Sequence, residues 1–118
     1  MVVICSASIV RAENKRSFVR NHQLYSACSH VIKKTDKVAE KSFCYGFISA
    51  AVEYNDALSK EPKNANRLCL PDYETTLGTF VQTYYNWAKE NPIYLSETAS
   101  RAILRALIAA YPCLPPTK

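Results

Sequence analysis

The chain has very little glycine and no strand-like pattern. Its 118 residues include two glycines, Gly46 and Gly78, and no stretch alternates apolar and polar residues with a period of two. Apolar residues instead recur every three to four positions, which is the spacing of amphipathic helices. No apolar run approaches the roughly 20 residues of a membrane-spanning helix, so we expect no membrane partner. The sequence therefore predicts one small all-α domain.

The residues that metal binding and nucleophilic catalysis need are also scarce. The two histidines, His22 and His30, are eight positions apart, and no Cys-x-x-Cys or His-x-x-x-His spacing is present. Zinc sites usually show such spacings, and phosphate sites often show a glycine-rich loop, which is absent too. We therefore predict no catalytic residue, no metal and no cofactor.

The charge of the chain favours a solvated surface over nucleic-acid binding. The formal net charge is +5, but the lysines and arginines are scattered along the sequence. They form neither a basic helix face nor a basic patch interleaved with aromatics, which nucleic-acid-binding proteins commonly show. We expect no nucleic-acid partner.

Apolar spacing predicts four helices, over residues 21–30, 38–58, 75–90 and 97–110. Asn21 and Ser96 are expected to cap the first and the fourth helix, because short polar side chains accept hydrogen bonds from a helix's first N–H groups. Gly46 lies inside the second helix, where glycine costs about 1 kcal/mol relative to alanine. We interpret it as a site where another helix approaches closely.

The chain has five cysteines, and four of them lie near the ends of the predicted helices: Cys28, Cys44, Cys69 and Cys113. In an antiparallel helix pair the end of one helix lies beside the start of the next, and the outer ends also meet. Disulfides Cys28–Cys44 and Cys69–Cys113 would thus each close one hairpin of a small four-helix bundle. Four cysteines allow three pairings, and the sequence leaves the other two open.

The fifth cysteine, Cys5, lies in an apolar run at residues 1–10. Residues 1–12 resemble a signal peptide that is short and lacks a basic leader, and cleavage after Ala12 would leave an even number of cysteines. Residues 13–118 then form the domain. The alternative is a buried strand or helical turn at the amino terminus with a free Cys5.

The chain holds eight tyrosines and one tryptophan, more than a central core of this size accommodates. Aromatic side chains with a polar tip are enriched at protein interfaces, and the alternative is a position at the margin of the core. The polar segment 59–68 and nearby aromatics supply the candidate partner-binding residues, which are Asn64, Asn66, Arg67, Tyr73, Trp87 and Tyr94. The same surplus of aromatics is compatible with a homodimer.

The cysteines lie in characteristic sequence settings. These are LYSAC over 24–28, CYGFISA over 44–50, CLP over 69–71, NP over 91–92 and ALIAAYPC over 106–113. In these segments the chain resembles the Rap/Tai family of type VI secretion immunity proteins. It departs from the family pattern at Thr79, which stands where a glutamine usually completes a capping box.

This resemblance implies a small periplasmic all-α protein that binds and occludes a cognate toxin, typically a peptidoglycan amidase, and so protects the producing cell. No cofactor and no turnover are implied. Two alternatives remain open at this point. One is a periplasmic acid-stress chaperone of the HdeA kind, and the other is a helical module that binds a lipid or another small ligand.

Overall fold

The computed structural model describes residues 18–60, 68–71 and 75–113. Four of the predicted partner-binding residues, Asn64, Asn66, Arg67 and Tyr73, lie outside these ranges. The predicted signal peptide at residues 1–12 lies outside them as well.

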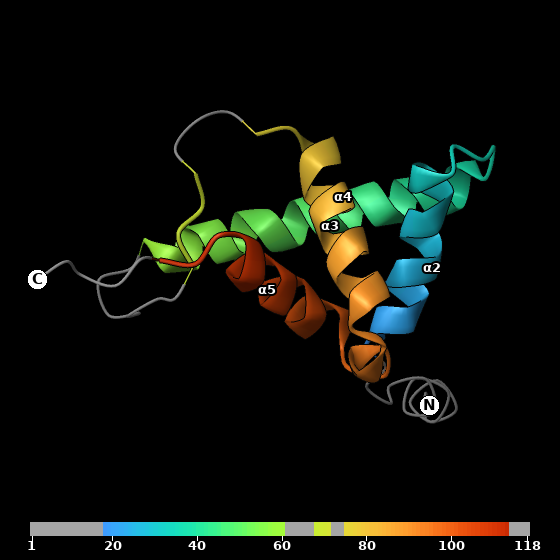
Figure 1. The fold of residues 1–118 in the computed structure, drawn as a ribbon. Helices are drawn as coiled ribbons and strands as arrows, with labels where there is room; N and C mark the ends of the chain where they lie inside the picture. The colour runs from blue at the N-terminus through green and yellow to red at the C-terminus, as the bar shows by residue number, and fades with distance from the viewer. Residues whose placement is uncertain (1–17, 61–67, 72–74, 114–118) are drawn as a thin grey trace, which may run out of the picture.

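The described residues form four α-helices and one short 3-10 helix (Figure 1). They are α2 (Asn21–Ile32), α3 (Val38–Ser59), α4 (Leu77–Glu90), η1 (Pro92–Tyr94) and α5 (Ala99–Ala110). The described part of the chain contains no β-strand, only isolated bridges between Arg20 and Thr98 and between Leu68 and Pro112. The predicted all-α class and the four predicted helices are confirmed.

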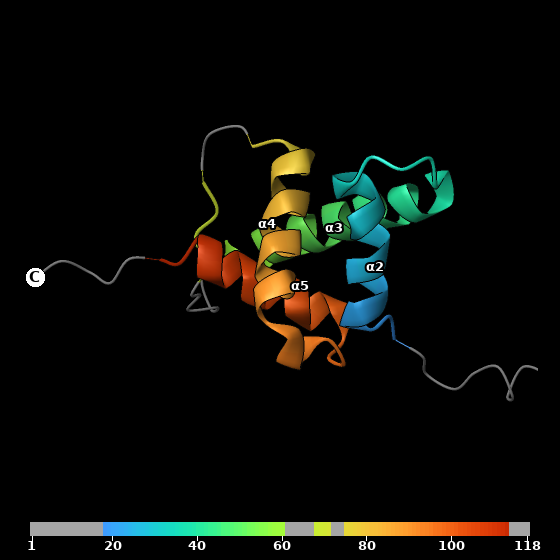
Figure 2. The same cartoon turned by 45° about the vertical axis from the view of Figure 1, so that its right-hand side comes forward.

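The longest helix, α3, is the platform on which the others are arranged. The helices α2, α4 and α5 all contact α3. In Figures 1 and 2 they lie on the near side of α3, and α4 crosses in front of it. One side of α3 therefore carries most of the packing of the domain.

The core is built from a few large side chains and many small ones. The large buried side chains include Leu24, Ile48, Val81, Tyr84, Ile103 and Leu107. The alanines among the buried residues are Ala27, Ala88, Ala99, Ala102 and Ala106, three of them on α5. Small side chains on one helix face let neighbouring helices pack closely, so α5 fits tightly into the domain.

Both predicted disulfides are present. Cys28 of α2 is bonded to Cys44 of α3, with Cα atoms 5.0 Å apart. Cys69 is bonded to Cys113, with Cα atoms 4.9 Å apart, and thus joins the segment before α4 to the residues after α5. The amide of Cys69 also donates a hydrogen bond to the carbonyl of Tyr111 (2.9 Å), which supports the second connection.

The predicted caps of two helices are wrong. Arg20, not Asn21, caps α2, and its amide donates to Oε1 of Gln23 (2.8 Å). Thr98, not Ser96, caps α5. The physical reason is tertiary: the chain entering α2 pairs with the chain entering α5, since the amide of Ala99 donates to the carbonyl of Val19 (2.8 Å).

The prediction that another helix approaches closely at Gly46 is also wrong for the part of the chain that the structure describes. Gly46 is exposed, and a Cβ atom built on it would have no contact within 4 Å. No described helix of this chain approaches α3 at that point. Packing among the described residues therefore does not explain a glycine that weakens the helix by about 1 kcal/mol.

The two disulfides should stabilise the domain to different extents. They span 16 and 44 residues, and loop-closure entropy then gives contributions of about 3 and about 4 kcal/mol. We expect Cys69→Ala/Cys113→Ala to lower the free energy of unfolding by up to about 4 kcal/mol. We expect Cys28→Ala/Cys44→Ala to lower the free energy of unfolding by more than about 3 kcal/mol, which is the loop-closure contribution alone. Both cysteines are fully buried, so their replacement also leaves a cavity in the core.

The measurement is urea denaturation of the oxidised variants, with the oxidised parent chain as control. A loss below about 1 kcal/mol for either pair would contradict the view that the pair stabilises the domain.

Candidate partner-binding site

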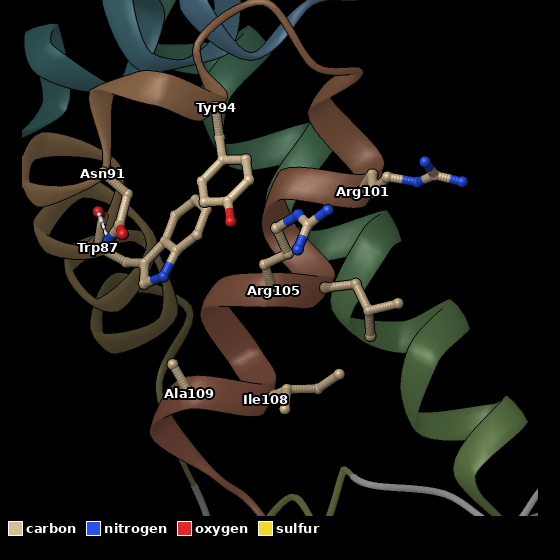
Figure 3. A pocket seen from close by; sticks show the side chains of 8 residues that line it. Trp87, Asn91, Tyr94, Arg101, Arg105, Ile108 and Ala109 are labelled. Atoms are coloured by element: carbon tan, nitrogen blue, oxygen red, sulfur yellow. Dashed lines mark hydrogen bonds between the residues drawn. The ribbon is translucent and has the colours of Figure 1, made fainter.

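A groove lies between the end of α4, η1 and α5, with a volume of about 490 Å³. Figure 3 shows its lining, which consists of Trp87, Asn91, Tyr94, Arg101, Leu104, Arg105, Ile108 and Ala109. The lining combines two aromatic rings, two guanidinium groups and aliphatic side chains. Trp87 and Tyr94 were both predicted as partner-binding residues, and the structure brings them together here.

The two aromatic rings are stacked. The centroids of the Trp87 and Tyr94 rings are 5.6 Å apart, and the ring planes differ by 16°. The turn at Asn91 and Pro92 produces this geometry because it ends α4 and folds η1 back over the last turn of the helix. The side chain of Asn91 donates to the carbonyl of Trp87 (2.8 Å), and the amide of Tyr94 donates to the carbonyl of Asn91 (3.0 Å).

Arg105 of α5 completes the cluster. Its Cζ atom lies 4.4 Å from the centroid of the Tyr94 ring, a distance typical of a cation–π contact. Glu97 holds the guanidinium in place by accepting two hydrogen bonds from Arg105. Nε donates to Oε1 (2.8 Å) and Nη2 donates to Oε2 (2.9 Å). Hydrogen bonding from Arg105 lowers the pKa of Glu97, and hydrogen bonding to Glu97 raises the pKa of Arg105.

A buried asparagine, Asn21, supports this cluster through hydrogen bonds to the backbone of Tyr94 and Glu97. Asn21 at the start of α2 is fully buried, and its side-chain amide donates to the carbonyl of Tyr94 (3.0 Å). Its Oδ1 accepts a hydrogen bond from the Tyr84 hydroxyl, and its backbone amide donates to the carbonyl of Glu97 (2.7 Å). Burial raises the pKa of Tyr84, so this hydroxyl keeps its proton and remains a donor. One residue thereby fixes both Tyr94 and Glu97.

The rim of the groove is cationic and apolar. Arg101, one turn before Arg105 on α5, is exposed, and in Figure 3 its guanidinium extends away from the stacked rings. Ile93, the middle residue of η1, is 79% exposed, and in the sequence it lies between the lining residues Asn91 and Tyr94. The sequence interpretation missed both arginines. The sequence does contain a pattern that could have indicated them. Arg101 and Arg105 are four positions apart, so they share a helix face with Leu104 and Ile108.

These groups suit the binding of a protein. Tryptophan, tyrosine and arginine are the residue types that most often dominate binding energy at protein interfaces. In this groove their positions are set before any partner arrives, which reduces the entropy lost on binding. Among the described residues no group of three His, Cys, Asp or Glu side chains lies close enough to hold a metal ion. No described helix is long and apolar enough to cross a membrane.

The fold and the groove define a small, disulfide-bonded, all-helical binding protein. Residues 20–113 match the family model of the Rap1a immunity proteins, and this match covers most of the chain. The chain therefore belongs to the Rap1a immunity protein family. No curated protein matches the chain, and no solved structure matches it. Membership in this family implies a non-enzymatic role in binding a cognate toxin.

Replacing Asn21 should loosen the domain where it supports the groove. We expect Asn21→Ala to lower the free energy of unfolding by about 2–3 kcal/mol, because the Tyr84 hydroxyl and the Tyr94 carbonyl would lose a buried partner. Asn55→Ala is the matched control, since among the described residues the Asn55 side chain donates to the carbonyl of Ala51 in its own helix. Urea denaturation of both variants is the measurement, and equal losses would contradict the role assigned to Asn21.

The Glu97–Arg105 pair should make stability depend on pH. The folded protein lowers the pKa of Glu97. The pair therefore stabilises the fold at pH values above the pKa that Glu97 has in the unfolded chain. That contribution is lost as the pH falls through the folded pKa. We expect the parent chain to lose more stability than Glu97→Gln between about pH 6 and about pH 3. Thermal unfolding across this range measures the difference, and parallel pH profiles would show that the pair contributes nothing.

Proposed function

We propose that this protein is a type VI secretion immunity protein that acts in the periplasm. In this proposal its target is a toxin that hydrolyses peptidoglycan, of the amidase class, and it protects the producing cell. Family membership supports toxin binding. The two disulfides support an oxidising compartment, because disulfides form and persist there and are rare in the cytosol.

The mechanism that fits the structure is steric occlusion. The observation that carries it is the cluster of Trp87, Tyr94 and Arg105, which Glu97 and Asn21 hold in one arrangement. In the proposal, this cluster contacts the rim of the toxin's substrate cleft and keeps peptidoglycan out. The positive groups at the groove favour an acidic surface on the toxin.

The test of function uses purified candidate amidase toxins and the disulfide-bonded chain. We expect a stoichiometric complex with one toxin, loss of that toxin's hydrolysis of peptidoglycan, and growth of cells that produce the toxin in the periplasm only when the chain is present. Weak binding to many unrelated proteins, with no inhibition, would instead favour the chaperone alternative.

The test of the groove compares two charge reversals. Arg101→Glu changes the groove, and Lys33→Glu makes the same charge change at an exposed residue just after α2 that does not line the groove. We expect Arg101→Glu to weaken toxin affinity at least about tenfold and Lys33→Glu to leave it unchanged. Isothermal titration calorimetry is the measurement. Equal effects of the two reversals would show that net charge, and not the groove, governs binding.

A further inference from the structure

The two disulfides differ in their exposure to solvent. Cys28 and Cys44 are both fully buried between α2 and α3. Cys69 is exposed, Cys113 is half-buried, and both lie outside the helices. A disulfide exchanges with a thiol only when the thiolate can reach one of its sulfur atoms, so exposed disulfides are the labile ones. The folded protein therefore protects Cys28–Cys44 from exchange and leaves Cys69–Cys113 accessible.

A cavity of about 450 Å³ lies beside the exposed end of this disulfide. The end of α3 supplies Asp56, Ser59 and Lys60 to its described lining, and the segment 68–71, which includes Cys69, supplies the rest. This volume is within the range of sites that bind small molecules. Cys113, which the structure also describes, does not line the cavity. A small thiol in the cavity would therefore meet the disulfide on the side of Cys69.

The charged groups of the cavity are paired with each other. Nζ of Lys60 lies 3.0 Å from Oδ2 of Asp56, and the two side chains are 71% and 40% exposed. The species that attacks a disulfide is the thiolate anion. Because the ammonium group of Lys60 offsets the negative charge of Asp56, the carboxylate does not keep an incoming thiolate away from Cys69.

Noncovalent contacts hold the two disulfide-bonded segments together as well. The amide of Cys69 donates to the carbonyl of Tyr111 (2.9 Å), and Leu68 forms an isolated bridge with Pro112. Leu68 is also buried. These contacts do not need the S–S bond, so they should keep the Cys113 thiol near Cys69 after the bond is opened. The reverse reaction is then intramolecular, and the disulfide can form again.

We propose that Cys69 is a site of reversible S-thiolation by a small thiol of the glutathione type. The thiolate sulfur forms a bond to Sγ of Cys69, the Cys69–Cys113 bond breaks, and Cys113 leaves as a thiolate that takes up a proton. One disulfide is exchanged for another, so the step needs no oxidant or reductant. The cavity shares no lining residue with the groove of Trp87 and Tyr94. The proposal therefore goes beyond toxin binding and does not depend on it.

The test uses the full chain with both disulfides formed, in a Cys5→Ser background that removes the fifth thiol. The protein is incubated with reduced glutathione, quenched with acid and alkylated, and each cysteine is then assigned by peptide mass spectrometry. We expect early glutathione adducts on Cys69 to exceed those on Cys113 at least about tenfold. The Cys28–Cys44 disulfide should open at least about a hundredfold more slowly, because the core covers it.

Urea below the unfolding transition separates exchange in the folded protein from exchange through unfolding. Cys28–Cys44 should open faster as urea raises the unfolded population, whereas the rate at Cys69 should hardly change. Parallel urea dependence at the two disulfides would overturn the proposal, since glutathione would then reach Cys69 only in the unfolded chain. Opening of Cys28–Cys44 as fast as Cys69–Cys113 in the absence of urea would overturn it as well.

Two charge reversals test whether the thiol enters through the cavity. Lys60→Glu puts a second carboxylate beside Asp56, and Lys33→Glu makes the same charge change at an exposed residue that does not line the cavity. We expect Lys60→Glu to slow the glutathione reaction at Cys69 about fivefold and Lys33→Glu to leave its rate unchanged. Both residues are exposed, so circular dichroism should show an unchanged fold. Equal rates for the two variants would overturn the assignment of the cavity as the thiol site.

Discussion

The structure depends on the burial of one polar side chain, Asn21. An amide removed from water must find hydrogen-bond partners inside the protein, or its burial costs several kcal/mol. Asn21 finds them in the Tyr84 hydroxyl and the Tyr94 carbonyl, while its backbone amide bonds the carbonyl of Glu97. Three segments that are distant in the sequence are thus held at one point, the start of α2.

This constraint reaches the groove directly. Tyr94 stacks on Trp87 and lies under Arg105, and Glu97 holds the guanidinium of Arg105. Because the backbone of both Tyr94 and Glu97 bonds Asn21, the positions of the aromatic and the cationic group are coupled. A rigid cluster of this kind loses little conformational entropy when a partner binds. That is the property an inhibitor without catalytic turnover needs.

The groove offers a partner two aromatic rings and two guanidinium groups on a partly aliphatic lining. These residue types suit the surface of a chemically distinct protein.

The four helices and both disulfides could be predicted from the sequence, because apolar spacing is a local signal and the cysteines lie near helix ends. Trp87 and Tyr94 stood out by residue type, and the resemblance to immunity proteins was confirmed by the family match. The caps at Arg20 and Thr98, the burial of Asn21 and the Glu97–Arg105 pair depended on the tertiary structure. Those features arise where the start of α2 meets the residues before α5, more than 70 positions away, and no local pattern encodes that meeting.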